Sequence, residues 1–444
     1  MVSFRCSDPL LEAGFAWARE RALSYAHNGG DPVGLWYEAA LPGRDAFCIR
    51  DAAHQRAGAA LLGLTEHTYN MFRRFAESCA DSRDDCMYWE IAKTGGPAPV
   101  DYASDEDFWY NLPANFDLLQ ACWAEYCWTG DGRYLEHPFL RFYESTCTRF
   151  MARWDRDGDG WPEHRKTDGR RGLGSYNESR RSPALGGDLP GAMFAGLQAY
   201  ANILARRGET ARARETAARA ADVRRRYLAQ WYFPQRRRFY GALEEDGRFR
   251  AQYYDEGNFL PIYFGLLDGA PELPEALDNV LAHGMKNTEG KTYLPQLCFG
   301  RGREAEGLRA LRALCSPKLP RREYPEVSFA ALSSLAQLAA GVTAPEPGVL
   351  RTLSGLPEGW AELRDVPVLG GRIHVRQEGA VRTALDLPDG PSFRWRVCFP
   401  GTWRSILIDG EPCPARQERD PAGRAVSCLD VPLLRPGRHS AAAE

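Results

Sequence analysis

Residues 115–129 read Asn115-Phe-Asp-Leu-Leu-Gln-Ala-Cys-Trp-Ala-Glu-Tyr-Cys-Trp-Thr129, and the turn Gly130-Asp131 follows them. The apolar residues recur at helical spacing up to this turn, and a second helical segment then covers 135–154. Residues 190–207 and 209–231 make a similar pair around Gly208. Because two helices joined by a short loop pack side by side, the sequence predicts a fold built from helical hairpins.

Helical spacing continues over most of the first 342 residues, with long loops between the helical segments. The other predicted helices cover 10–27, 51–80, 257–267, 273–283, 304–315 and 327–340. Three loops, at 28–50, 81–114 and 155–189, are long and rich in Trp, Gly and Asp. Loops of this length are uncommon in compact domains unless they build a functional site. We therefore expect the functional residues to lie in these loops.

The helical pattern stops near Pro345-Glu-Pro-Gly348, and short alternating stretches follow. These stretches cover 372–376, 381–387, 393–399, 405–408 and 425–431. Such alternation, interrupted by turns such as Asp409-Gly410, is typical of antiparallel strands. We therefore predict a mainly α protein with two domains. Residues 1–342 form an α/α barrel, and residues 343–444 form a small antiparallel β-sandwich.

The composition excludes several classes of protein. The chain has 444 residues, a formal net charge of −3, 44% hydrophobic and 26% charged residues, as expected for a globular protein. Near-neutral charge gives no reason to expect nucleic acid as a partner. A mean hydropathy of −0.46, with no long apolar run, predicts no membrane partner. The N-terminus lacks the charged and apolar regions of a signal peptide, so we expect a cytoplasmic protein.

The cysteines and aromatic residues give weaker indications. Twelve cysteines occur without any Cys-x-x-Cys pair, which fits neither a zinc site nor a redox motif and favours a reducing compartment. The 12 Trp, 19 Tyr and 20 Phe residues favour a carbohydrate ligand slightly, because the C–H faces of sugars stack on aromatic rings. A large aromatic core explains the same composition equally well.

Three segments carry a resemblance to a known superfamily. They are Leu41–Gln55; Asp155–Glu163 with Ser175–Pro183; and Val327–Leu350 with Leu356–Trp360. Together they resemble the six-hairpin glycosidases, the (α/α)6-barrel superfamily of glucoamylases, trehalases, processing α-glucosidases and α-L-rhamnosidases. The resemblance implies an inverting glycoside hydrolase that releases a non-reducing-end sugar from an oligosaccharide or glycoside. The Asp-Cys-Pro-x-Arg-Asp-Glu-Arg signature of the rhamnosidases is absent from this chain.

A glycosidase needs two carboxyl groups beside the bond that it cleaves. The resemblance implies that Glu178, in the central loop, is the general acid, with Asp51 as the second choice. It implies a late base at Glu323 or Glu326, which lie on either side of a helix-breaking proline, and we prefer Glu326. We expect aromatic rings to desolvate Glu178 and raise its pKa, and hydrogen-bond donors to hold the late glutamate ionised.

Several side chains around these carboxylates are candidates for binding the sugar. Paired Arg and Asp side chains can bind adjacent hydroxyls, although Asp51 could instead cap a helix and loop charges are often merely solvated. Each aromatic residue could equally be part of the core. The candidate substrate-binding residues are Arg50, Arg44, Asp45, His54, Arg180, Trp36, Trp109 and Trp161.

The sequence predicts no organic cofactor. Asp155-x-Asp157-x-Asp159-Gly160 has the oxygen spacing of a calcium loop, but Lys166 stands at the twelfth position, where the complete loop has Glu. A plain turn is therefore the preferred interpretation, with calcium as the alternative. Two other functions stay open: a glycoside phosphorylase, in which phosphate replaces water, and an inactive carbohydrate-binding protein. The oligomeric state also stays open.

Overall fold

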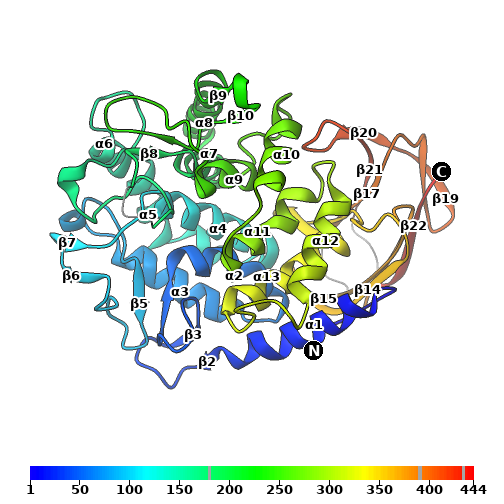
Figure 1. Cartoon of the computed structure of the whole chain (residues 1–444). Helices are drawn as coiled ribbons and strands as arrows, with labels where there is room; N and C mark the ends of the chain where they lie inside the picture. Colours follow the sequence, from blue (N-terminus) through cyan, green and yellow to red (C-terminus); the bar gives the residue numbers. More distant parts are fainter. Residues whose placement is uncertain (179–181, 389–392, 433–435) are drawn as a thin grey trace.

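A computed structural model describes residues 1–178, 182–388, 393–432 and 436–444, and it consists of a helical part followed by a sheet-rich part (Figure 1). The helices are α1 (Pro9–Ser24), α2 (Ile49–Leu61), α3 (Thr65–Ser78), α4 (Pro113–Thr129), α5 (Phe139–Ser145), α6 (Met151–Trp154), α7 (Asp188–Arg206), α8 (Thr210–Gln230), α9 (Asp255–Tyr263), α10 (Leu273–His283), α11 (Thr288–Cys298), α12 (Glu304–Cys315) and α13 (Pro325–Ser333). No helix in the described ranges is long and apolar enough to cross a membrane. The order of helical and sheet-rich parts agrees with the prediction.

Six of these helices contact one another in a ring. Helix α2 contacts α4, and contacts continue from α4 to α7, α9, α11 and α13. Helix α13 contacts α2, so the ring closes. A second set of helices lies against the ring, with α3 on α2, α8 on α7, α10 on α9, α12 on α11 and α1 on α13. Successive helices therefore alternate between the inner ring and its outer cover.

Burial of the side chains explains which helices form the ring. Every residue of α13 is buried, and nearly every residue of α7 is buried. A helix that is apolar on all sides belongs inside a protein. Helix α8, by contrast, is rich in exposed arginines and buries only one stripe, which includes Ala220, Val223 and Tyr227. It therefore covers the outside of the ring.

Glycine allows α2 and α13 to approach closely. A Cβ atom added at Gly58 would lie 2.3 Å from the backbone oxygen of Phe329. We expect Gly58→Ala to lower the free energy of unfolding by about 1–3 kcal/mol, because the two backbones must separate to admit the methyl group. Urea denaturation measures this change. Gly132→Ala is the matched control, since nothing lies within 4 Å of the added atom; equal stability of the two variants would contradict the prediction.

Two features of the helical part differ from the prediction. The segment predicted as one helix over 51–80 is two helices, α2 and α3, because Gly63 has a φ of +80° and reverses the chain between them. Helix α11 was not predicted, since its sequence is polar at the start and contains Pro295. This missed helix completes the inner ring.

The sheet-rich part contains two sheets. The seven-stranded sheet has the order β1 (Ser3–Cys6), β14 (Trp360–Val368), β15 (Gly371–Glu378), β16 (Arg382–Leu387), β22 (Gly437–Ala443), β18 (Ser405–Ile408) and β19 (Glu411–Pro414). The five-stranded sheet has the order β12 (Val342–Glu346), β13 (Val349–Thr352), β17 (Arg394–Pro400), β21 (Ala425–Val431) and β20 (Arg416–Arg419). Buried side chains from both sheets, such as Val375 and Trp395, belong to one apolar core.

The sheets depart from the expected pattern in two respects. Strand β1 comes from the first residues of the chain and pairs with β14, so the larger sheet is not built from residues after 342 alone. Strands β13 and β17 are parallel, whereas all other neighbouring pairs in the two sheets are antiparallel. The sequence pattern shows alternation along a strand, but it does not show which strand lies beside it.

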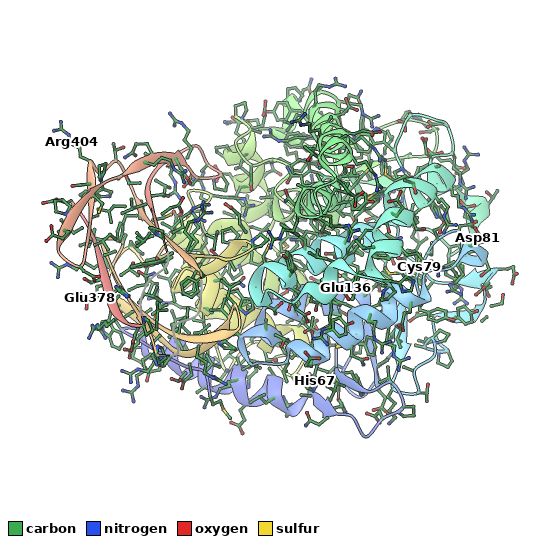
Figure 2. All side chains as sticks on the ribbon, turned by 180° about the vertical axis from the view of Figure 1, so that it is seen from behind. His67, Cys79, Asp81, Glu136, Glu378 and Arg404 are labelled. Atoms are coloured by element: carbon green, nitrogen blue, oxygen red, sulfur yellow. The ribbon has the colours of Figure 1, made fainter. Side chains whose placement is uncertain are left out.

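Polar contacts join the two parts of the molecule. The Gln377 side chain of β15 donates a hydrogen bond to the Ala340 carbonyl at 3.0 Å. The indole of Trp128 at the end of α4 donates to the Pro367 carbonyl of β14 at 2.9 Å. Figure 2 shows the opposite side of the molecule, with Glu378 on the sheets and His67 and Glu136 on the helical part. The two sheets therefore pack directly against the helical part.

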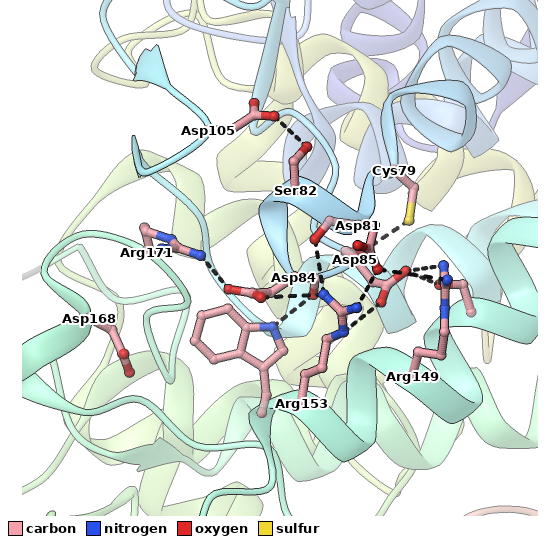
Figure 3. Close-up of polar contacts among 12 residues, drawn as sticks. Cys79, Asp81, Ser82, Asp84, Asp85, Asp105, Arg149, Arg153, Asp168 and Arg171 are labelled. Atoms are coloured by element: carbon pink, nitrogen blue, oxygen red, sulfur yellow. Dashed lines mark hydrogen bonds and ion pairs between the residues drawn. The ribbon is translucent and has the colours of Figure 1, made fainter.

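A buried ionic network fixes the start of the long loop between α3 and α4. Asp85 has no exposed surface, and its carboxylate accepts hydrogen bonds from Ser145 and Arg149 and pairs with Arg153. Neighbouring Asp84 pairs with Arg171, as Figure 3 shows. These contacts tie the loop to α5, α6 and the loop after α6. The same long loop supplies Trp89, Glu90, Asp101 and Trp109 to the pocket described below.

Candidate active site

Two connected chambers lie where the long loops meet the inner helices. The larger chamber has a volume of about 230 Å³ and the smaller one about 30 Å³, and both are lined by Arg50, Asp51, Glu289 and Glu326. The larger chamber is also lined by Ala40, Leu41, Arg44, Cys48, Trp89, Glu90, Asp101, Trp109 and Glu178. The smaller chamber is also lined by His54, Tyr176, Glu256, Phe259, Leu260, Asn287, Gly290, Thr292 and Tyr293.

Four of the lining carboxylates stand in the first turns of inner helices. Asp51 belongs to the first turn of α2, Glu256 to that of α9, Glu289 to that of α11 and Glu326 to that of α13. The N-terminus of a helix carries a partial positive charge that favours carboxylates. Since these helices are neighbours in the ring, their first turns bring four acids to one end of it.

Arg50 lies among the acids of the larger chamber. Its Nη1 is 3.3 Å from Oε1 of Glu178, and its Nε is 3.5 Å from Oδ1 of Asp51. The guanidinium also lies over the rings of Trp89 and Tyr176, at 6.0 and 5.9 Å from their centroids. Cation–π contacts of this kind hold the cation in place. Arg50 therefore has a fixed position between Asp51 and Glu178.

Two buried acids hold Tyr176, which supports Arg50. The backbone N–H of Tyr176 donates to Asp188 at 2.6 Å, and its hydroxyl donates to Asp117 at 2.9 Å. Burial raises the pKa of both carboxyl groups to about 7. Asp188 is the first residue of α7. Its further role is to fix the loop that leads to Glu178.

Asp51 and Glu326 line both chambers, and the charge of Asp51 acts on Glu326. Burial raises the pKa of Asp51 to about 6, although Arg50 opposes this shift. Burial raises the pKa of Glu326 well above its ordinary value, and the charges of Asp51 and Glu289 raise it further. Two acids that repel each other in a buried site keep a proton that separate acids would lose. Both acids therefore lose their protons at a higher pH than an exposed carboxyl group does.

His54 lines the smaller chamber as a neutral side chain. Burial lowers the pKa of its imidazole to about 3. Its Nε2 lies 3.0 Å from the Thr292 hydroxyl, and its ring stacks on Tyr293 with a centroid distance of 4.0 Å. Phe259 and Leu260 complete an apolar wall here. This chamber combines apolar surface with a few polar groups, as small-molecule sites commonly do.

The structure places many of the predicted site residues around these chambers. Asp51, Glu178, Glu326, Arg50, Arg44, His54 and Trp109 line one chamber or the other. Arg180 lies outside the described residues. The predicted carboxylates thus come from three regions of sequence that are more than a hundred residues apart.

Four predicted residues lie elsewhere. Glu323 is exposed, and its backbone carbonyl accepts a hydrogen bond from Tyr25. Asp45 is exposed and pairs with Lys93 at 2.7 Å. Trp36 is fully buried, where it stacks on a histidine and donates to Asp31. Trp161 is buried under Arg226. Both tryptophans are therefore core residues, and Glu326 rather than Glu323 faces the pocket.

The surroundings of the two predicted catalytic glutamates also differ from expectation. The Glu178 side chain is half exposed and paired with Arg50, whereas aromatic desolvation was predicted. Glu326 is only 4% exposed and lies among other acids, whereas donors favouring its ionised form were predicted. The loop around Glu178 reaches solvent, while the first turn of α13 is packed into the ring.

Four acids in the chambers were missed: Glu90, Asp101, Glu256 and Glu289. Asn287 caps α11, because its side chain accepts a hydrogen bond from the Gly290 N–H, and Glu289 stands two residues after it. An Asn in such a position is a sequence signal for the start of a helix. Glu90 stands on β5 (Glu90–Ala92), which pairs with β4 (Ala46–Cys48) just before α2. This pairing of distant segments has no local signature in the sequence.

The three aspartates with calcium-like spacing lie together in an exposed turn. Oxygens of Asp155, Asp157 and Asp159 lie within 4.8 Å of one another. Asp155 accepts hydrogen bonds from the N–H groups of Gly158 and Gly160, and the other two accept from residues two positions ahead. These bonds are those of an ordinary Asx turn.

Comparison with known proteins gives structural matches only. No protein-family model matches the chain, and no curated protein matches its sequence. A GH78 rhamnosidase of Bacillus sp. GL1 superposes with a TM-score of 0.62 at 15% identity, covering 88% of this chain and 41% of the other. An α-L-rhamnosidase from Dictyoglumus thermophilum gives 0.64 at 12% identity, covering 99% and 50%. The fold of this chain is therefore similar to that of these two rhamnosidases.

A third match belongs to a different class of enzyme. A human-microbiome protein described as a kojibiose phosphorylase superposes with a TM-score of 0.57 at 9% identity, covering 97% of this chain and 63% of the other. The chain spans about two fifths to a half of the two rhamnosidases. At these identities the matches define the fold and leave the reaction open.

Proposed function

We propose that this protein is an inverting glycoside hydrolase whose helices form an (α/α)6 barrel. The observation that supports it best is that Asp51 and Glu326 line one pocket with Arg50 and that burial raises the pKa of both acids. An inverting glycosidase needs one protonated and one ionised carboxyl group on opposite sides of the sugar. Two acids, of which the more buried keeps its proton and the other is ionised, meet that requirement.

Charge assigns the two roles within the pair. Glu326 is the more deeply buried acid, and the charges of Asp51 and Glu289 oppose its ionisation, so it holds the proton and serves as general acid. Asp51 lies 3.5 Å from Arg50, which favours its ionised form, so it activates the water. The sequence suggested the reverse roles for these two residues, or Glu178 as acid. Variants at all three positions distinguish these assignments.

The charge of the pocket favours hydrolysis over phosphorolysis. Among the described residues, its walls carry the carboxyl groups of Asp51, Glu90, Asp101, Glu178, Glu256, Glu289 and Glu326, against the guanidinium groups of Arg44 and Arg50 only. Even with several of these acids protonated, a phosphate dianion would meet a negative field. Water has no such barrier.

We therefore expect the rate to be independent of inorganic phosphate. The measurement is turnover of a susceptible glycoside with and without phosphate, followed by assay of free sugar and sugar 1-phosphate. Free sugar alone is the expected product. Formation of sugar 1-phosphate in proportion to phosphate would identify a phosphorylase instead.

A panel of aryl glycosides tests the proposal as a whole. The panel contains 4-nitrophenyl α- and β-glycosides of rhamnose, glucose, mannose and galactose, and proton NMR identifies the first anomer released. We expect hydrolysis of at least one glycoside with inversion. Binding of sugars without hydrolysis of any glycoside would instead favour a carbohydrate-binding protein.

The proposal also covers the two domains, the substrate class, the compartment and the cofactor. Residues 1–342 form the catalytic barrel and residues 343–444 the accessory domain, with strand β1 joining the two. An oligosaccharide or glycoside is the substrate, and the protein works in the cytoplasm without an organic cofactor. Calcium at Asp155, Asp157 and Asp159 stays the less favoured alternative to a plain turn.

A further inference from the structure

One group of residues lines only the larger chamber and has no part in the proposed acid–base pair. It consists of Arg44, Glu90, Asp101 and Trp109, none of which lines the smaller chamber. The larger chamber is bordered by exposed Leu41 and half-exposed Glu178, so it is the part that opens to solvent. A sugar held with its reacting carbon at Asp51 and Glu326 would direct its leaving group into this chamber.

Glu90 is a buried acid without a protein donor on one of its oxygens. Its side chain is only 3% exposed, and Arg44 approaches its Oε2 at 3.0 Å. Oε1 of Glu90 receives no hydrogen bond from any described donor group, and Oδ2 of Asp101 is ion-paired with Arg44 at 3.7 Å. Buried carboxyl oxygens are normally satisfied, so an unsatisfied one on a pocket wall points to a ligand that brings donors.

The same wall carries an aromatic ring in a fixed position. The Trp109 indole donates to the Asn111 side chain at 2.8 Å, and the Trp109 backbone N–H donates to the Asp101 carbonyl at 2.7 Å. The ring is therefore tied to the acid beside it. A sugar unit supplies both partners at once, since its hydroxyls can donate to the acids and its C–H face can stack on the indole.

We propose that Arg44, Glu90, Asp101 and Trp109 form a second sugar subsite that binds the leaving-group sugar. This inference rests on the proposed hydrolase function and narrows its substrate class to oligosaccharides with a neutral sugar next to the cleaved bond. A glycoside with an apolar leaving group would leave the buried acids without donors, and an acidic sugar would add charge beside them.

The charges around Glu90 make this subsite sensitive to alkaline pH. The groups that face it are Arg44, Asp101, Asp51 and, across the β4–β5 pair, Cys48, whose thiol stays neutral because burial raises its pKa. Burial and Asp101 raise the pKa of Glu90 to about 8. Below that pH Glu90 keeps its proton; above it, Glu90 and Asp101 are two adjacent charges that repel each other.

Equilibrium binding tests the subsite without depending on turnover. The Glu326→Gln variant is titrated, by tryptophan fluorescence and calorimetry, with maltose, kojibiose, rutinose and neohesperidose, and with the monosaccharides glucose and rhamnose. We expect at least one disaccharide to bind about tenfold or more tightly than the corresponding monosaccharide, because the second sugar adds hydrogen bonds to charged groups.

Added substitutions assign this preference to the wall. Glu90→Ala should abolish the disaccharide advantage and leave monosaccharide binding unchanged. Glu90→Gln should keep it and remove the loss of affinity above about pH 8, since the amide cannot ionise. Glu136→Gln, an exposed glutamate far from the pocket in sequence (Figure 2), is the matched control and should change nothing.

The outcomes separate this inference from the proposed function. Equal affinities for disaccharides and monosaccharides, an unchanged advantage in Glu90→Ala, or no binding of any disaccharide would each overturn the subsite. Tight disaccharide binding together with no hydrolysis by the wild-type protein would support the subsite and overturn the hydrolase. Circular dichroism of each variant shows whether a loss of binding reflects unfolding.

Discussion

Glu326→Gln should lower kcat on disaccharides and alkyl glycosides by about 10²–10⁴, the usual contribution of general acid catalysis. The amide keeps the shape of the side chain but has no acidic proton to give the leaving oxygen. A 4-nitrophenolate leaving group scarcely needs that proton, so activated glycosides should lose much less. The measurement is the ratio of kcat values for the two kinds of substrate in the variant and in the wild type.

Asp51→Asn should behave differently, because a base that activates water is needed whatever group leaves. Its losses should be large and similar on both kinds of substrate. The opposite pattern, with Asp51→Asn sparing activated glycosides, would exchange the two roles. Glu178→Gln is the third member of the series. A selective loss there would make Glu178 the acid, whereas small effects at both Asp51 and Glu326 would overturn the proposed pair.

The class of fold could be predicted because its signals are local. Helical spacing in segments such as 115–129 and 190–207, and the change to alternation after residue 345, come from neighbouring residues along the chain. The break between α2 and α3 was missed although Gly63 marks it. A single glycine within a helical pattern is tolerated often enough that it does not predict a turn by itself.

The candidate site could be predicted only in part. The pairing of Arg50 with Asp51 and the position of Glu326 next to Pro325 are visible in short motifs. The position of Glu90 in the pocket is not visible in the sequence. It depends on the pairing of β5 with β4 and on the later part of the same loop, which contains Asp101. Trp36 and Trp161 were predicted to bind sugar but do not line the pocket. Their positions in loops suggested exposed rings, but packing beneath other side chains buries both rings.

Protonation also could not be predicted from sequence. The expectation that Glu178 would be desolvated followed from the need for a protonated acid near neutral pH, yet Trp89 and Tyr176 pack against Arg50 instead. Asp51 and Glu326 stand in the first turns of two inner helices. Their pKa values rise because the ring closes around them, and ring closure involves every part of the helical chain.

Asp85→Ala should lower the free energy of unfolding by about 3–5 kcal/mol, the usual effect of breaking a buried ion pair by removing one partner. The Asp85 carboxylate is fully buried and receives contacts from Ser145, Arg149 and Arg153 (Figure 3). Without it, two arginines lose their shared acceptor beside a new cavity. The φ of Asp85 is +61°, which further disfavours alanine. Urea denaturation at neutral pH measures the change.

Two further substitutions separate charge from position. Asp85→Asn keeps the shape and a side chain that tolerates positive φ, so its loss should be clearly smaller than that of Asp85→Ala. Asp81→Asn is the matched control: Asp81 pairs with the same Arg153, but its side chain is 72% exposed, and exposed pairs contribute little to stability. Equal losses at Asp81 and Asp85 would show that burial is not what makes this network stabilising. If instead only the Asp85 variants lose stability, the position of the loop that carries Glu90 and Trp109 depends on the buried Asp85 carboxylate. The Asp85 variants should then also bind sugars more weakly than the wild type.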